Sequence, residues 1–171
     1  MVIAAIGFWS AATVRAWAIA DDAALAAVMK DARATLQVGL KASQCVGTPI
    51  SAKFEIDDGK LQLSVYTMKG NDFMEVVADA ETGAIVKAEK ITDAEDLKAA
   101  TSQKAAMAKA KMSLLRAAET TVKANPWFRA VSIFPELKNG EANAEVTLFA
   151  GGLFKNITQQ LDCGYENTLC Y

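Results

Sequence analysis

Carboxylates are the side chains here that could do acid–base chemistry, because the 171-residue chain contains no histidine. Without histidine it lacks the usual general base at neutral pH, Ser-His and Cys-His nucleophile pairs, and the ligands of most catalytic zinc sites. Two acidic pairs stand in predicted turns, Asp57 with Asp58 and Asp79 with Glu81. Their oxygens could bind calcium weakly, but EF-hand spacing is absent and solvated turn carboxylates explain both pairs better.

Other reaction chemistries find little support in the sequence. Residues 151–154, Gly-Gly-Leu-Phe, lack the lysine pattern and the strand-to-helix context of a phosphate-binding loop. Glycosidase acids need a cleft and carboxyl groups roughly 5 to 10 Å apart, which no motif here indicates. We therefore predict a protein that is not an enzyme, with no catalytic residues, no cofactor and no bound metal.

The three cysteines are the remaining reactive side chains. Cys163 and Cys170 lie in a short tail, 163–171, where a disulfide between them would close a small ring. Cys45 is then unpaired, and we expect it to be a buried small hydrophobic residue. The alternative is a long-range disulfide between Cys45 and one of the tail cysteines.

Composition and the N-terminal block restrict partners and location. A formal net charge of −2 lacks the basic excess that a nucleic-acid backbone requires, so no nucleic-acid partner is expected. Residues 2–14 are almost wholly apolar, and Ala16-Trp17-Ala18 has the small-x-small pattern that signal peptidase recognises. This predicts a signal peptide over residues 1–20, cleaved after Ala18 or Ala20, although it lacks a positive segment at its start. A buried N-terminal helix or a membrane anchor is the alternative.

An aromatic pair beside a cation follows the second predicted helix, in Pro126-Trp127-Phe128-Arg129. Two interpretations stay open. Trp127 and Phe128 could form a hydrophobic plug between helix and sheet, with the charged end of Arg129 reaching solvent. Alternatively, Trp127, Phe128 and Arg129 form an exposed recognition patch.

The chain matches itself at a fixed offset, which indicates an internal repeat. The offset is 81 residues in the second part of the unit and 78 upstream, which predicts a three-residue insertion around residues 136–138. Matched pairs are Gly59/Gly140, Val65/Val146, Gly70/Gly151, Phe73/Phe154 and Val76/Ile157 at the first offset, and Ala52/Ala130, Leu36/Leu114, Ala32/Ala110 and Met29/Met107 at the second. We interpret the chain as two copies of one unit.

Each unit begins with a predicted helix. Apolar residues recur every three or four positions from Leu25 to Leu40, with Asp21 or Asp22 as N-cap, and again from Met107 to Val122. The linker between the copies, 93–103, is also predicted to be helical, with Thr92 as N-cap.

Alternating apolar and polar residues after each helix predict strands. The turns Asp57-Asp58-Gly59 and Asn139-Gly140 contain residues that tolerate positive φ. The expected fold is α+β, with two repeats that each pack one helix on an antiparallel meander of three to four strands. Its parts are repeat 1 at 22–92, the linker, repeat 2 at 104–162 and the tail at 163–171.

Residues 77–86, with the sequence VADAETGAIV, resemble the signature hairpin of the PepSY family. Its features are a strand ending in aspartate, a Thr-Gly turn and a strand of β-branched residues, so the motif residues are Asp79, Thr82 and Gly83. The resemblance covers residues 22–92 well and 104–162 more weakly. In the second copy Cys163-Gly164 follows Asp162, and the Thr-Gly hairpin is missing.

PepSY domains are extracytoplasmic modules of the propeptides of thermolysin-like secreted metallopeptidases and of small exported bacterial proteins. The resemblance implies a periplasmic or secreted protein that binds a protein partner, such as a peptidase that it inhibits or regulates. It supplies no catalytic residues, and because the apolar block is short for a bilayer span, we expect no stable membrane insertion after signal cleavage. An open sheet edge could accept a partner's extended segment by strand addition. A small-molecule or metal-sensing module and a hydrolase remain the alternatives.

Overall fold

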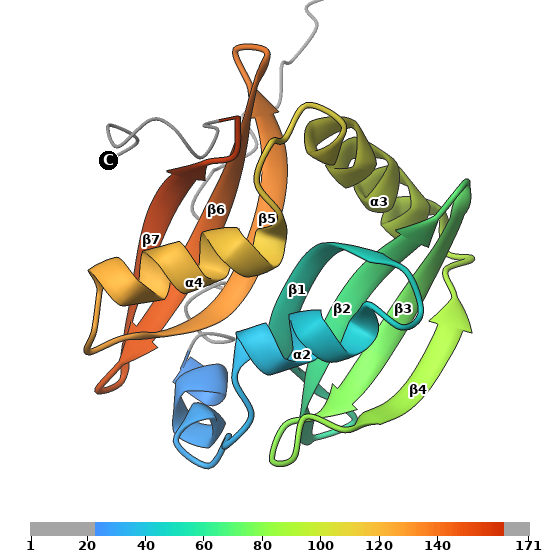
Figure 1. The fold of residues 1–171 in the computed structure, drawn as a ribbon. Helices are drawn as coiled ribbons and strands as arrows, with labels where there is room; N and C mark the ends of the chain where they lie inside the picture. Colours follow the sequence, from blue (N-terminus) through green and yellow to red (C-terminus); the bar gives the residue numbers. More distant parts are fainter. Residues whose placement is uncertain (1–22, 163–171) are drawn as a thin grey trace, which may run out of the picture.

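Seven antiparallel strands form one sheet in the computed structural model, which describes residues 23–162 (Figure 1). The α+β class expected from the sequence is confirmed. The predicted signal peptide at 1–20 and the predicted Cys163–Cys170 disulfide lie outside the described residues. The strands are β1 (Thr48–Asp57), β2 (Lys60–Lys69), β3 (Asp72–Asp79), β4 (Ile85–Lys90), β5 (Arg129–Lys138), β6 (Glu141–Ala150) and β7 (Leu153–Gln160).

The strand order is β4-β3-β2-β1-β5-β6-β7, so two meanders join through β1 and β5. At this junction Ala52 pairs with Ile133 and Lys53 with Ser132. The sequence predicts meanders but not their fusion into one sheet, because pairing between strands so far apart in the chain leaves no local pattern. The result is a continuous sheet whose outermost strands are β4 and β7.

The two hairpin turns predicted from Asp58-Gly59 and Asn139-Gly140 are confirmed. All four residues have positive φ, at 46° and 74° in the first turn and 54° and 86° in the second. Such turns match the right-handed twist of the flanking strands, so each connects its strands in two residues. These turns fix the registers of β1 with β2 and of β5 with β6.

The helices are shorter than the apolar periodicity predicts. They are α2 (Leu36–Ser43), α3 (Ala94–Met107) and α4 (Leu114–Ala124), and residues 23–29 are also helical. The single helices expected from Leu25 to Leu40 and from Met107 to Val122 are therefore wrong, because each is interrupted. α3 has Asp93, not Thr92, as its N-cap.

The first interruption lies just before α2. The backbone N–H groups of Arg33 and Ala34 donate to the carbonyl oxygen of Ala80, at 3.1 and 3.0 Å. Thr35 then caps α2 by accepting from the N–H of Val38 at 3.3 Å. The chain leaves the helix because these N–H groups bond to the turn that follows β3 instead of to the preceding helical turn.

The second interruption, just before α4, has the same construction. The N–H groups of Lys111 and Met112 donate to the carbonyl oxygen of Leu161, at 2.7 and 2.9 Å. Ser113 then caps α4 by accepting from the N–H of Arg116 at 3.3 Å. Contacts of this kind join distant parts of the chain, so the periodicity of the helix could not reveal them.

The change of offset lies elsewhere than predicted. β1, β2 and β3 begin at Thr48, Lys60 and Asp72, and β5, β6 and β7 begin 81 residues later. The offset of 78 applies to the first residues of α2 and α4. The expected insertion around residues 136–138 is therefore wrong: the three additional residues fall in α4, which has 11 residues against 8 in α2.

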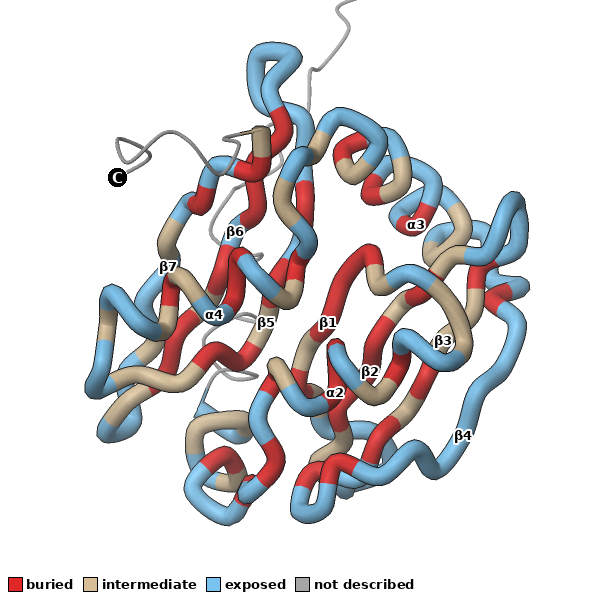
Figure 2. Tube along the Cα trace, in the orientation of Figure 1, coloured by how far each residue is buried: buried red, intermediate tan, exposed pale blue. Residues whose placement is uncertain are grey.

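Helices cover both faces of the sheet, unequally (Figure 1). α2 and α4 lie side by side over one face and bury the larger core, whose central members include Leu36, Leu63, Leu114, Ile133 and Val146. Figure 2 shows this burial concentrated on the central strands, whereas β4 is exposed along its length. Within residues 23–162 no helix has the length and apolar character needed to cross a membrane.

α3 packs on the opposite face, near one end of β1 and β2. The hydroxyl of Ser51 donates to Oε1 of Gln103 at 2.9 Å, in a buried contact. A smaller apolar cluster lies beside it, formed by Ile50, Phe73, Ile91 and Ala100. α3 thereby positions its last residues next to α4, and this arrangement shapes one of the surface grooves described below.

Candidate functional site

Asp79, the last residue of β3, organises the turn that carries the PepSY-like motif. Its Oδ1 accepts from the N–H of Glu81 at 3.2 Å, from the N–H of Thr82 at 2.8 Å and from the hydroxyl of Thr82 at 2.7 Å. The N–H of Gly83 donates to the Asp79 carbonyl oxygen at 2.8 Å. The three motif residues therefore lie together and hold the shape of their own hairpin.

The electrostatics of Asp79 suit a structural carboxylate. Hydrogen bonds from the hydroxyl and then the N–H of Thr82 hold the pKa of this exposed carboxyl below its ordinary value. A carboxylic acid that donates a proton near neutral pH needs a raised pKa. Asp79 is instead ionised at neutral pH, and one of its oxygens already accepts three hydrogen bonds.

The motif hairpin is held against α2. An ideal Cβ on Gly83 would lie 2.4 Å from Cγ1 of Val38, so only glycine permits this approach. The neighbouring Glu81 forms an ion pair with Arg33 at 3.1 Å. Because Arg33 also donates its N–H to Ala80, the turn is tied to the segment that leads into α2.

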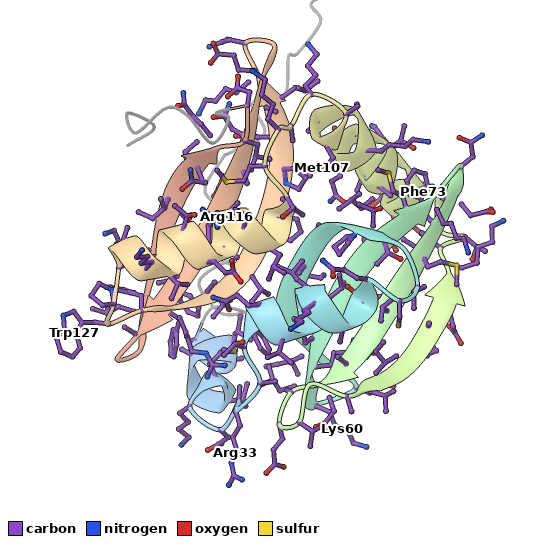
Figure 3. The ribbon with its side chains drawn as sticks, viewed as in Figure 1. Arg33, Lys60, Phe73, Met107, Arg116 and Trp127 are labelled. Atoms are coloured by element: carbon purple, nitrogen blue, oxygen red, sulfur yellow. The ribbon has the colours of Figure 1, made fainter. Side chains whose placement is uncertain are left out.

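The structure separates the members of the predicted recognition patch. Trp127 is 88% exposed and projects from the connection between α4 and β5 (Figure 3). Phe128 is partly buried and packs against the larger core. Phe128 is therefore partly buried, as a hydrophobic plug would be, and Trp127 is exposed, while a recognition role for Trp127 stays a prediction.

Arg129 points into the protein, so the expectation that its charged end reaches solvent is wrong. Its guanidinium donates from Nη1 to the carbonyl oxygen of Ala32 at 2.6 Å and from Nη2 to that of Ala34. It also lies 5.5 Å from the ring centroid of Phe54. Burial lowers the pKa of Arg129, but a guanidinium still stays charged. The forked pair of hydrogen bonds from this guanidinium ties β5 to the segment before α2.

A hollow of about 630 Å³ lies beside Trp127. The connection from α4 to β5 forms one side, and the turn between β6 and β7, with Gly151 and Gly152, forms another. Phe149 also lines it. Leu153 follows this turn as the first residue of β7 and is 72% exposed. Two large apolar side chains, Trp127 and Leu153, are thus exposed near the start of an outermost strand.

The two outermost strands differ in charge. β4 carries three charged side chains in six residues, and two ion pairs involve them, Lys87 with Glu89 and Lys90 with Asp72. β7 carries one charged side chain, Lys155, in eight residues. Charged side chains on an edge strand discourage pairing with another chain, so β7 is the less protected edge.

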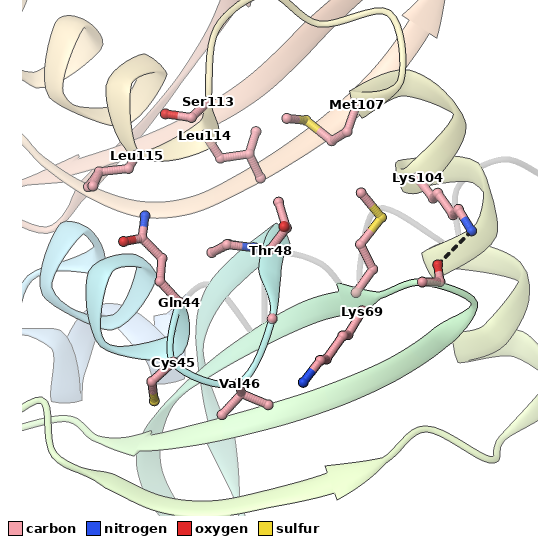
Figure 4. A pocket seen from close by; sticks show the side chains of 14 residues that line it. Gln44, Cys45, Val46, Thr48, Lys69, Lys104, Met107, Ser113, Leu114 and Leu115 are labelled. Atoms are coloured by element: carbon pink, nitrogen blue, oxygen red, sulfur yellow. Dashed lines mark hydrogen bonds between the residues drawn. The ribbon is translucent and has the colours of Figure 1, made fainter.

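A second concave region lies between the two meanders, and no sequence motif indicates it. It is a groove of about 730 Å³ between the end of α2, the β2–β3 turn, the end of α3 and the start of α4 (Figure 4). Its residues come from four separate stretches of the chain. Only the tertiary structure brings them together, so the sequence carries no signal for the groove.

Cys45 lies on the wall of this groove and is exposed, so the buried position expected for it is wrong. The cause is that α2 ends at Ser43 and Cys45 falls in the following turn, where its Sγ donates to the carbonyl oxygen of Ala42 at 3.2 Å. Within residues 23–162 no group of three or more acidic or cysteine side chains is placed to hold a metal ion. Asp57, the last residue of β1, and Asp58, in the turn that follows, are both exposed.

Comparison with known proteins gives little further information. No protein-family model and no curated protein matches the chain. Among solved structures, the chain is similar to a "putative lipoprotein" of Clostridium difficile 630, with a TM-score of 0.37 and 18% sequence identity, over 68% of this chain and 76% of that one. A TM-score this low does not establish a shared fold, so neither location nor function is transferred from that protein.

Proposed function

We propose that this chain is a non-enzymatic extracytoplasmic binding protein of PepSY type, which inhibits or regulates a secreted or envelope peptidase by protein–protein contact. Export rests on the apolar block at residues 1–20, and the family rests on the hairpin at 77–86. One structural observation carries the binding role: the weakly charged edge of β7 begins beside the exposed side chains of Trp127 and Leu153.

We also propose that the fold contains two copies of one helix-and-meander unit. The same arrangement precedes α2 and α4. In each, two consecutive backbone N–H groups donate to one carbonyl oxygen, and a hydroxyl residue then caps the helix. Ala52 and Ile133, which pair at the β1–β5 junction, also stand 81 residues apart, as do the strand starts. An antiparallel pair of equivalent residues is what a two-fold relation between the copies requires.

The second unit then has one strand fewer than the first in the described part of the chain. β3 pairs with β4, whereas β7 pairs with β6 alone among residues 23–162. Strand addition at β7 would give the second unit a fourth strand, as in the first. An extended segment of a partner peptidase is the occupant that the PepSY resemblance favours.

Hydrogen bonding shows which groups such a partner would meet. The N–H of Leu161 donates to the carbonyl oxygen of Ala142 in β6. Because neighbouring residues of a strand direct their backbone groups to opposite sides, Phe154, Asn156 and Thr158 direct theirs away from β6. A partner strand paired with these groups would end near Trp127, and tryptophan is frequent among residues that dominate binding energy.

The test is inhibition of a secreted thermolysin-like metallopeptidase by the purified full chain, with complex formation measured in parallel. Thr158→Pro removes an outward N–H from β7 without affecting the β6–β7 ladder. Its matched control is Ala88→Pro, which removes an outward N–H from β4, because Ile91 donates to Phe73 on the inner side of that strand. We expect inhibition by the unmodified chain and by Ala88→Pro, and a loss of about tenfold or more with Thr158→Pro.

Trp127→Ala should also weaken inhibition while leaving the fold intact, since this side chain is exposed. Absence of both inhibition and complex formation would refute the peptidase role. Equal inhibition by Thr158→Pro and Ala88→Pro would refute strand addition at β7.

A further inference from the structure

The groove between the meanders has the size of a small-molecule site. Its volume of about 730 Å³ falls within the range of roughly 300 to 1,000 Å³ typical of ligand pockets. It lies at the junction of the two halves of the chain, at a different place from the hollow beside Trp127, and the two share no lining residue. Any role of this groove is therefore independent of the β7 edge.

Apolar side chains on its walls have part of their surface uncovered. Val46, Pro49, Met68, Met107 and Leu115 all line the groove and are half-buried. They come from the turn after α2, from β1 and β2, from the end of α3 and from the start of α4. The two methionines are unbranched and flexible, so they can adapt to an aliphatic chain. The groove thus offers an apolar surface to a ligand.

The charged side chains of the groove are all positive. Lys69 and Lys104 line it, and no aspartate or glutamate does, in a chain with 20 acidic and 18 basic residues. Nζ of Lys104 donates to neutral acceptors, the carbonyl oxygen of Gly70 at 2.9 Å (Figure 4) and Oδ1 of Asn71 at 3.1 Å. The side chain of Lys69 has no ion-pair or hydrogen-bond partner among residues 23–162. Neither ammonium charge is balanced by a carboxylate within the described part of the chain.

The start of α4 reinforces this polarity. Leu114 and Leu115, its first two residues, line the groove together with the N-cap, Ser113. The first turn of α4 contains no acidic residue. The partial positive charge at the start of a helix favours an anion, so this wall of the groove adds no negative charge.

We propose that this groove binds an aliphatic monocarboxylate, such as a medium-chain fatty acid, with its carboxylate near Lys69 and its chain along the apolar walls. The anionic head supplies a negatively charged partner for the side chain of Lys69, which has none within residues 23–162. The single aliphatic chain suits walls that contain methionine, leucine, valine and proline and no aromatic side chain.

Calorimetric titration of the full chain with decanoate tests the proposal, and three related probes resolve what is recognised. Decanol keeps the aliphatic chain without the charge, decyltrimethylammonium reverses the charge, and acetate keeps the carboxylate without the chain. We expect saturable one-to-one binding of decanoate and at least tenfold weaker binding of each other probe. Equal binding of decanoate and decanol would overturn the assignment of a carboxylate site.

A matched pair of variants locates the binding. Lys69→Gln removes a charge from the groove, whereas Lys60→Gln removes an exposed charge from the opposite end of the same strand, away from the groove (Figure 3). A charged hydrogen bond contributes about 1.5 to 3 kcal/mol, so Lys69→Gln should weaken decanoate binding about tenfold or more, and Lys60→Gln should not change it. Thr158→Pro should not change it either, which keeps this result separate from the peptidase test.

Absence of decanoate binding by the full chain would overturn the proposal. Equal weakening by Lys69→Gln and Lys60→Gln would also overturn it, because binding would then follow the overall charge and not the groove. Lys60 and Lys69 are exposed side chains, so their replacement should leave the core unchanged. Far-ultraviolet circular dichroism of each variant checks that its fold is intact.

Discussion

Replacing Gly83 with alanine tests whether the motif hairpin is held against α2. Gly83 has φ of +74°, and its added Cβ would lie 2.4 Å from Cγ1 of Val38. Gly59, in the β1–β2 turn, has the same φ of +74° but no neighbouring atom within 4 Å of such a Cβ. Gly59→Ala is therefore a matched control that carries the conformational cost without the steric one.

The expected magnitudes follow from these two geometries. A left-handed conformation costs an L-residue about 1 to 2 kcal/mol, and this cost applies to both variants. Overpacking adds about 1 to 3 kcal/mol at Gly83 alone. Val38 cannot easily rotate away, because β-branched residues in helices strongly prefer one χ1 rotamer. Gly83→Ala should therefore destabilise the protein by about 1 to 3 kcal/mol more than Gly59→Ala.

Urea unfolding followed by circular dichroism measures the difference, since the exposed Trp127 is a poor fluorescent reporter of the core. Val38→Ala supplies the second half of a double-mutant cycle. Val38 is 44% exposed, so Val38→Ala should destabilise the protein only mildly. In the Val38→Ala background, the destabilisation caused by Gly83→Ala should fall to that caused by Gly59→Ala. Equal destabilisation by the two glycine variants, or no recovery with Val38→Ala, would refute close packing of the hairpin on α2.

Three further predictions follow from individual side chains. Arg129→Met should lower the free energy of unfolding by about 2 to 3 kcal/mol, because the carbonyl oxygens of Ala32 and Ala34 lose their donors. Arg129→Lys should lower it less. Equal stability in urea of the unmodified chain and both variants would contradict this. Burial, assisted by Asp96, raises the pKa of Tyr66 above its ordinary value of 10.0, so the neutral phenol stabilises the fold below that pH and this contribution is lost as the pH rises further. Tyr66→Phe should abolish a late step in the ultraviolet phenolate titration and flatten the alkaline loss of stability, and an unchanged titration would contradict the assignment. In a Trp9→Phe, Trp17→Phe background, Trp127 should emit as a solvated indole and be quenched readily by acrylamide, whereas blue-shifted, protected emission would mean that it is covered.

The sequence by itself determined the features that depend on neighbouring residues. Positive φ at Asp58-Gly59 and Asn139-Gly140 follows from the residue types that tolerate it, and the alternating strands follow from the two-residue period of a half-buried sheet. The internal match at 81 residues correctly anticipated the equal spacing of β2 and β3 with β6 and β7, whereas the offset of 78 predicted for β1 and β5 is wrong. Asp79, Thr82 and Gly83 belong here too, because the hydrogen bonds among them span at most four residues.

The tertiary structure decided what depends on residues far apart in the chain. The apolar stripe from Leu25 to Leu40 is helical in pattern, yet the helix breaks before Leu36 because Ala80, in the turn between β3 and β4, accepts the N–H groups of the break. The β1–β5 junction, the inward fork of Arg129 and the groove at Lys69 likewise join segments that share no local pattern. Periodicity reports which face of an element is apolar, but long-range packing determines where that element ends and what it meets.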